Sequence, residues 1–139
     1  MDMDNQKLID MLPPETNANR GFWEGTLVGE LRLQYGDSGV AQFPEYPVDR
    51  VSLGDKLEWR AASGRATLWS WVVMHQRYFP AFADEVPYLV AFVQLEEGPF
   101  MMATLVDPPA DLQCGAALEV VFERLSDDRA IPKFKVVNA

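Results

Sequence analysis

From residue 57 onward, apolar and polar residues alternate with the period of two that is typical of β-strands with one buried face. Glycine, proline and aspartate separate the apolar runs, as they do in turns. The runs predict strands over 65–75, 87–95, 100–106, 118–123 and 131–136, with a shorter strand at 57–61. Because helical segments do not alternate with these strands, a doubly wound α/β fold is disfavoured. The pattern predicts a mainly β protein built around a small antiparallel barrel of five main strands.

The strand predicted over 65–75 is the longest and is rich in aromatic and β-branched residues. A strict period of two places Trp69, Trp71 and Val73 on one face of it. We therefore expect these three side chains to share one environment.

The N-terminal segment has helical rather than alternating spacing. Its first apolar stripe consists of Leu8, Ile9, Met11 and Leu12 and is stopped by two prolines. Residues 16–19 offer N-cap candidates for a second short helix, which carries Phe22, Trp23 and Leu27 on one face. The adjacent aromatics either pin this arm to the domain or cover a ligand or a partner.

Between the arm and the barrel, a short alternating run over 31–35 is followed by a glycine-containing turn and a return segment at 40–43. Residues 44–55 contain two prolines and a glycine and indicate a loop. This organisation predicts a helical arm at 1–29, a β-hairpin segment at 30–56 and a barrel domain at 57–139.

Composition narrows the possible functions. The 139 residues include 21 acidic against 12 basic side chains, a formal net charge of −9, which disfavours binding to a phosphate backbone. The single cysteine, Cys114, excludes an intramolecular disulfide and a multi-cysteine zinc site. The acidic N-terminus does not resemble a signal peptide, and no apolar run has the length of a membrane helix. We expect a cytoplasmic protein with neither a nucleic-acid nor a membrane partner.

Candidate chemistry is sparse. The chain has no glycine-rich phosphate loop and no nucleophile elbow, and its only histidine is His75, so no catalytic group is assigned. His75 ends the long strand, where it is either a hydrogen-bonded rim residue or a group that orients a ligand. The following loop contains Tyr78, Phe79 and Phe82, which either close one end of the barrel or form an apolar patch for a partner or an acyl chain.

Five segments together resemble the DUF35 family. They are 20–25, 63–75, 86–98, 118–123 and 131–134, and the resemblance spans about residues 17 to 136. That family joins a helical arm and a rubredoxin-like zinc ribbon to an acyl-CoA-associated OB-fold. Its members are accessory subunits of thiolase-like, 3-hydroxy-3-methylglutaryl-CoA-synthase-like or MaoC-hydratase-like enzymes. The resemblance therefore implies an OB-fold accessory subunit that binds or organises acyl-CoA together with such an enzyme.

The same resemblance implies a ribbon without its metal. The positions of the family's zinc ligands are occupied by Tyr35, Ser38, Asp49 and Ser52. None supplies a thiolate or an imidazole, so we expect no zinc and no tightly bound cofactor. The hairpin is then expected to be held by packing of Leu33, Tyr35, Phe43 and Tyr46.

As residues that bind the ligand or the partner, the resemblance and the aromatic loop suggest Phe22, Trp23, His75, Tyr78, Phe79 and Phe82. The cations available for the phosphates of CoA are Arg20, Arg77 and Lys133. A homodimer formed through exposed strand edges is also compatible with the pattern.

Two alternatives come from other functional classes. The first is single-stranded nucleic-acid binding by the OB-fold, with bases stacked on Trp69, Trp71, Tyr78 and Phe79. The second is a free-standing protein that binds or acts on acyl thioesters, using His75 with Asp84 or Glu85.

Overall fold

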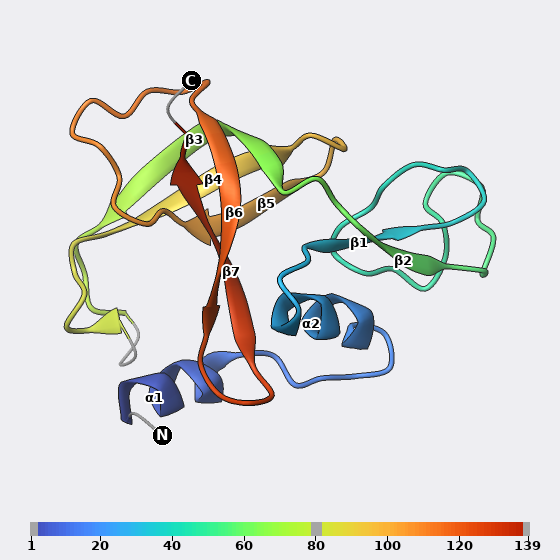
Figure 1. Cartoon of the computed structure of the whole chain (residues 1–139), viewed down its shortest axis with the longest axis horizontal. Coiled ribbons are helices and arrows are strands. Elements are labelled where there is room, and N and C mark those ends of the chain that lie inside the picture. The colour runs from blue at the N-terminus through green and yellow to red at the C-terminus, as the bar shows by residue number, and fades with distance from the viewer. Residues whose placement is uncertain (1–2, 79–81, 138–139) are drawn as a thin grey trace.

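The computed structural model describes residues 3–78 and 82–137 (Figure 1). Its elements are α1 (Met3–Met11), α2 (Arg20–Leu27), β1 (Arg32–Tyr35), β2 (Glu58–Ala61), β3 (Arg65–Met74), β4 (Tyr88–Leu95), β5 (Phe100–Thr104), β6 (Ala117–Arg124) and β7 (Ala130–Val136). Both expected helices and all expected barrel strands are present, with ends that differ by one or two residues from the prediction. Neither described helix has the length and apolar character needed to cross a membrane.

The barrel is built from β3 to β7, in the strand order β5-β4-β3-β6-β7 with antiparallel neighbours. The two outer strands of this sheet meet through a parallel bridge between Leu105, just beyond β5, and Phe134 of β7. The Val106 N–H donates to the Phe134 carbonyl at 2.8 Å, which brings the edges together. This is the strand arrangement of an OB-fold, so the predicted five-stranded barrel is confirmed.

The barrel core lies inside this curved sheet. Phe134 is fully buried there, together with Leu68, Val93, Leu95 and Leu118 from the neighbouring strands. Each of these residues occupies the inward-facing positions of its strand, which is the reason the sequence alternates.

A second sheet consists of β1 and β2, paired antiparallel with Leu33 opposite Arg60. The expected division of the chain placed β2 at the start of the barrel domain, and its pairing is different. The backbone groups of β2 bond to β1, and the Ala62 N–H extends the ladder to the Leu31 carbonyl at 2.7 Å. In the barrel, both edges of β3 are already taken by β4 and β6, so β2 has no place there. The expected return strand at 40–43 is reduced to one bridge, between Gln34 and Gln42.

Helix α2 lies between the two sheets (Figure 1). Phe22 and Trp23 are buried and their rings meet edge to face, with centroids 5.0 Å apart. On the side of the small sheet, the Phe22 ring lies 5.5 Å from Phe43. On the side of the barrel, the Arg129 guanidinium lies 4.7 Å from the Trp23 ring centroid. One helix of eight residues thus joins both sheets.

Two glycines allow α2 to approach the small sheet closely. A Cβ on Gly21 would lie 2.2 Å from Cδ1 of Trp59, and one on Gly25 would lie 2.7 Å from the Glu30 carbonyl oxygen. The N-cap residue Asn19 does not cap the helix with its side chain, because that side chain accepts from the Thr16 N–H at 2.7 Å. Asn19 therefore fixes the turn that leads into α2.

A β-bulge in β3 changes which side its aromatic residues face. The pairing of β3 with β4 shifts between Leu68 and Ser70, so Trp69 is an extra residue in the strand. Beyond the bulge, Trp71 lies opposite the buried Ala91 and packs on the core, whereas Trp69 is 57% exposed. The expectation that Trp69 and Trp71 share one face is wrong, because the inserted residue breaks the period of two.

Phe134 tests the closure of the barrel. We expect Phe134→Ala to lower the free energy of unfolding by about 3–5 kcal/mol, because it leaves a cavity where β5 and β7 meet. Urea denaturation monitored by circular dichroism measures this change. The neighbouring exposed substitution Lys135→Ala is the control and should cost less than about 0.5 kcal/mol. A loss below about 1 kcal/mol for Phe134→Ala would contradict its role in closure.

Candidate functional site

The outward side of β3, β4 and β5 forms a continuous uncharged surface, which we call the outer face. Cross-strand pairing places Ser70 opposite Phe92 and Phe92 opposite Met102, with Gln94 opposite Phe100 in the next outward row. The outer face comprises Trp69, Ser70, Val72, Val90, Phe92, Gln94, Phe100 and Met102. None of these residues is ionisable, although a quarter of the chain is charged. A sheet face with this composition is unusual for a solvent-exposed surface.

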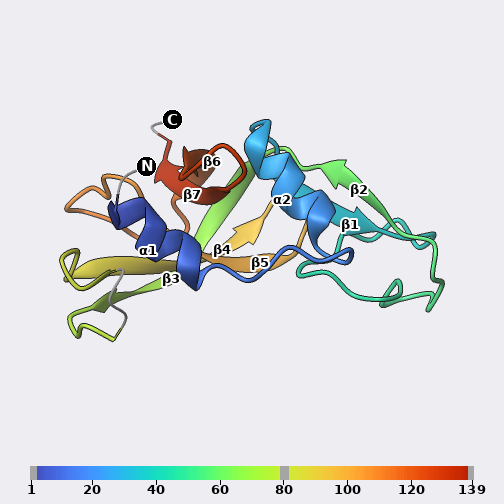
Figure 2. The same cartoon turned by 90° about the horizontal axis from the view of Figure 1, so that it is seen from below.

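Three aromatic rings form the centre of the outer face. The Phe92 and Phe100 rings stack with centroids 4.9 Å apart, and Trp69 meets Phe100 edge-on at 5.3 Å. Trp69 remains 57% exposed and Met102 71% exposed. Both described helices lie on the same side of β4 and β5 as the β6–β7 hairpin (Figure 2), which leaves the aromatic cluster uncovered. Exposed aromatic and methionine side chains gathered in this way indicate an interaction surface.

Charged groups border the outer face at the β4–β5 turn. There Arg65 and Glu96 form an ion pair with contacts of 2.5 and 2.8 Å, and the hydrogen bond from Arg65 holds the pKa of Glu96 below its usual value. A cleft of about 510 Å³ runs from Phe100 to the loop at 40–43 and is also lined by Arg50. The Arg50 guanidinium lies 4.6 Å from the ring centroid of Tyr46. The border is thus polar and the centre apolar, as in protein–protein interfaces.

The arm residues suggested as partner contacts are not on a surface. Phe22 and Trp23 are only 7% and 8% exposed, because α2 packs them between the two sheets. The two aromatic residues were expected either to attach the arm to the domain or to cover a ligand or partner. In the structure they attach the arm to the domain. In this structure, Phe22 and Trp23 are therefore not part of the surface that a ligand or partner would meet.

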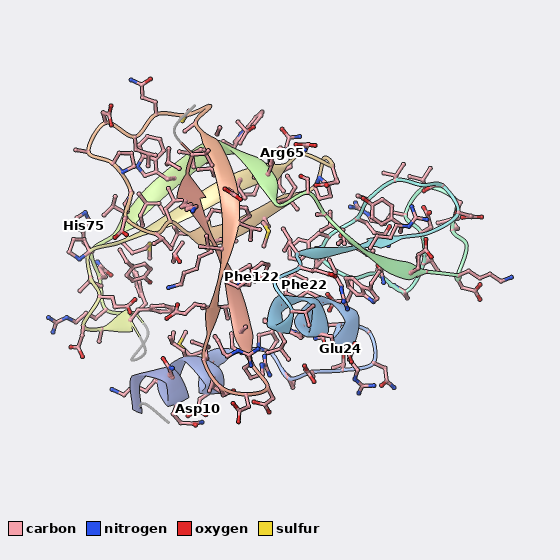
Figure 3. The ribbon with its side chains drawn as sticks, in the orientation of Figure 1. Asp10, Phe22, Glu24, Arg65, His75 and Phe122 are labelled. Carbon is pink, nitrogen blue, oxygen red and sulfur yellow. The ribbon has the colours of Figure 1, made fainter. Side chains whose placement is uncertain are left out.

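The other suggested binding residues follow β3. His75, Arg77 and Tyr78 are exposed, whereas Phe79 lies outside the described residues. Phe82 is half-buried and packs against Tyr88, with ring centroids 5.1 Å apart. Figure 3 shows His75 and Phe22 in different parts of the molecule. The suggested residues therefore do not form one site.

The three cations suggested for CoA phosphates are also dispersed. Arg20 begins α2, and Arg77 belongs to the β3–β4 connection on the opposite side of the molecule (Figure 1). Lys133 lies on β7 and is paired with Glu123 at 2.5 Å, beside a hollow of about 250 Å³ that Phe82 also lines. These positions do not provide one combined phosphate site.

The side chains that could ligate a metal do not cluster over 3–78 and 82–137. No three of the described histidine, cysteine, aspartate and glutamate side chains gather in a way that would hold a metal ion. Cys114 is exposed in the loop before β6.

Asp49 links the two turns in which the resemblance places the family's zinc ligands. Its carboxylate is 1% exposed and accepts from the Ser38 N–H at 3.0 Å, the Ser38 hydroxyl at 2.5 Å, the Val51 N–H at 2.8 Å and the Ser52 N–H at 3.2 Å. The Ser38 hydroxyl is the main cause that lowers the pKa of Asp49 to about 2, with the backbone N–H groups adding to it. Ser52 in turn donates its hydroxyl to Asp37.

These residues do not fit a tetrahedral zinc ion. Both oxygens of the Asp49 carboxylate already accept two hydrogen bonds. The Tyr35 ring packs under the Arg60 guanidinium, 4.7 Å from its centroid. Zinc sites of this type require thiolate or imidazole ligands, which none of the four positions has.

Sequence reasoning did not find the outer face. A usable signal existed in the apolar run YLVAFV of β4, which extends over both faces of the strand. In an antiparallel barrel only one face of a strand meets the core, so an apolar second face indicates a further contact. The role of Trp69 could not be found in this way, because it depends on the bulge.

Comparison with known proteins places this fold among named relatives. Residues 59–123 match the family described as the C-terminal OB-fold domain of ChsH2. A DUF35 domain-containing scaffold protein of Pyrococcus furiosus is 30% identical over 93 residues, which cover 66% of this chain and 67% of that protein. A second scaffold protein of this description, from Methanocaldococcus jannaschii, is 33% identical over 67 residues, or 48% of this chain and 47% of that protein.

A longer relative carries an enzyme name. The 3-oxo-4,17-pregnadiene-20-carboxyl-CoA hydratase alpha subunit of Mycobacterium tuberculosis is 33% identical over 95 residues. That match covers 68% of this chain but only 30% of the hydratase subunit. A solved structure entitled Ltp2-ChsH2(DUF35) aldolase superposes with a TM-score of 0.80, over 90% of this chain and 98% of that one, at 24% identity. That likeness concerns the fold.

Tryptophan fluorescence tests the bulge and the outer face. The chain has four tryptophans, of which Trp69 is exposed, Trp23 is buried and Trp59 and Trp71 are intermediate. We expect Trp69→Phe to reduce the acrylamide quenching of the total emission, because it removes the most accessible indole. Trp71→Phe, the matched control on the inward side, should leave quenching unchanged or raise it. A larger drop for Trp71→Phe than for Trp69→Phe would show that the faces are assigned wrongly.

Proposed function

This chain belongs to the DUF35 family, and on that premise we propose that it is a non-catalytic accessory subunit that binds an acyl-CoA enzyme through its outer face. The names of its relatives support the class of function. Two of them are scaffold proteins and one is a subunit of an acyl-CoA hydratase. Because this chain spans 30% of the hydratase subunit and 47% of one scaffold protein, the enzyme partner is part of the proposal.

The observation that carries the proposal is the uncharged aromatic centre of the outer face. Interface cores are depleted of charge and enriched in aromatic residues and methionine. The centre of the outer face has this composition, since it consists of Trp69, Phe92, Phe100 and Met102. Removing such side chains from water favours association by about 25 cal/mol per Å² of apolar area. The paired charges of Arg65 and Glu96 then lie at the rim, where they add specificity to the contact.

The partner we propose is a subunit that acts on acyl-CoA thioesters, of the thiolase-like or MaoC-hydratase-like kind. The accessory subunit would complete the walls of the enzyme's acyl-CoA channel rather than hold the phosphates by itself. Its own candidate cations, Arg20, Arg77 and Lys133, are too dispersed for that task.

Nucleic-acid binding is less well supported by the same surface. Stacking on exposed aromatics is one half of single-strand binding, and cations that follow the phosphates are the other. The outer face contains neither lysine nor arginine, so it lacks the second half.

Introducing a charge on the outer face tests the proposal. We expect Met102→Asp to reduce recovery of the acyl-CoA enzyme at least about tenfold, because a buried unpaired carboxylate costs several kcal/mol and each 1.4 kcal/mol is a factor of ten. The measurement is an affinity pull-down of the tagged full chain from lysate of its source, with the captured enzyme identified and quantified by mass spectrometry. Val28→Asp is the matched control, since Val28 is 64% exposed beyond α2 and outside the outer face.

Several outcomes would reject this proposal. Equal recovery of an acyl-CoA enzyme by Met102→Asp and the unaltered chain would remove the outer face from the interface. Recovery of no acyl-CoA enzyme by the unaltered chain would reject the accessory role. The other possible occupant of the outer face is a second copy of this chain, which sedimentation analysis of the purified protein tests. A dimer that Met102→Asp dissociates would assign the outer face to self-association.

A further inference from the structure

We infer that the Asp49 carboxylate cross-links the turns at 36–39 and 48–54 in the place where the family's ribbon has a metal ion. The inference is independent of the partner proposed above. It rests on the disagreement between the zinc ribbon that the family resemblance implies and the residues that this chain has at those positions.

The geometry of Asp49 is that of a cross-link. One carboxylate oxygen accepts both bonds from Ser38, which belongs to the first turn. The other oxygen accepts from Val51 and Ser52, which belong to the second turn. A metal ion would join the same turns through ligands from both. Here Asp49, which belongs to the second turn, accepts two hydrogen bonds from the first turn and two from within its own turn.

The backbone of the first turn packs directly against the Asp49 side chain. A Cβ built on Gly36 would lie 2.4 Å from Oδ2 of Asp49, so the backbone of the first turn rests on the carboxylate itself. At Asp49 the chain also closes on its own loop, since the Asp49 N–H donates to Gly54 and the Leu53 N–H to Asp49, both at 2.8 Å. The turn is therefore held on both sides of Asp49.

Two buried glutamines hold the rest of the loop without a metal. Gln42 donates its side-chain amide to Gln34 Oε1 at 2.7 Å and to the Val48 carbonyl at 3.0 Å, and accepts from the Arg50 N–H at 3.0 Å. Gln34 accepts in addition from the Tyr46 N–H at 2.9 Å. Backbone groups of a loop with little regular structure are satisfied in this way. The packing of Leu33, Tyr35, Phe43 and Tyr46 expected from the sequence thus has a polar network beside it.

The sign of the pH dependence follows from this arrangement. The pKa of Asp49 is lowered to about 2, below the value near 3.9 of a free aspartate. A group with a lowered pKa stabilises the fold above its unfolded pKa, and this contribution is lost as the pH falls through the folded value. The other charged side chains of the two turns are Asp37, which accepts from Ser52, and Arg50, which lies over Tyr46. The stability that the cross-link contributes should therefore fall between about pH 4 and pH 2, and the carboxylate itself should take up its proton with a midpoint near pH 2.

The first test follows the bonds directly, by the amide proton shifts of Ser38, Val51 and Ser52 in the ¹⁵N-labelled full chain between pH 6 and pH 1.5. We expect the three amides to titrate together with a midpoint near pH 2. Ser38→Ala removes the strongest donor and should move the shared midpoint upward, toward pH 4, while leaving the fold intact. Three unrelated midpoints, or a midpoint unchanged by Ser38→Ala, would overturn the inference.

The second test replaces the carboxylate. Asp49→Asn turns an amide NH₂ toward either Ser38 or the second turn, so at least one hydrogen bond from a backbone N–H is lost in either orientation. We expect faster hydrogen exchange at Ser38, Val51 and Ser52, with exchange in the barrel strands unchanged. Asp55→Asn, at an exposed aspartate of the same loop, is the matched control and should leave exchange unchanged. Unchanged exchange in Asp49→Asn would contradict the cross-link.

The metal itself supplies the third measurement. The full chain, expressed with added zinc and purified without chelator, should hold far less than one zinc per chain by elemental analysis. Its thermal midpoint should be the same with and without EDTA. One zinc per chain, together with a fall in the thermal midpoint on adding EDTA, would overturn the inference and restore the family's metal.

Discussion

The burial of Phe22 and Trp23 between the two sheets is the interaction on which the arrangement of this molecule depends. The small sheet does not bury enough by itself, since it has only two strands. One ring contacts the loop of the small sheet through Phe43, and the other contacts the β6–β7 turn through Arg129. Because glycines at 21 and 25 bring the helix backbone against the small sheet, this contact leaves little freedom between the parts.

This use of the helix decides where a partner can bind. The aromatic residues of the arm are buried in the interior, and both helices lie on the β6–β7 side of the molecule (Figure 2). On the opposite surface of β3, β4 and β5, the large apolar side chains of Trp69, Phe92 and Met102 are exposed side by side. The proposed role as an accessory subunit therefore rests on an outward sheet face, and the loop residues first suggested by the sequence contribute less to it.

The loop beside the small sheet shows how hydrogen bonds can hold turns that have little regular structure. Structural zinc sites supply cross-links between turns that have few other contacts. Here a buried carboxylate and two buried glutamines satisfy the backbone groups of the same turns. The hydrogen bonds that Asp49 accepts weaken when its carboxylate is protonated. Acid, rather than a chelator, should therefore open the loop.

The sequence by itself determined the barrel, because inward positions that must avoid water alternate along each strand and turn residues mark the ends. It also determined the two helices, and it indicated the family through segments spread over most of the chain. Only the tertiary structure decided the partner of β2, because strand pairing depends on which edges are free. The tertiary structure also decided which side of the sheet Trp69 faces, since one bulged residue reverses the alternation. It decided as well that Phe22 and Trp23 are buried. An apolar side chain in a sequence can be either core or surface, and which of the two it becomes depends on what packs against it.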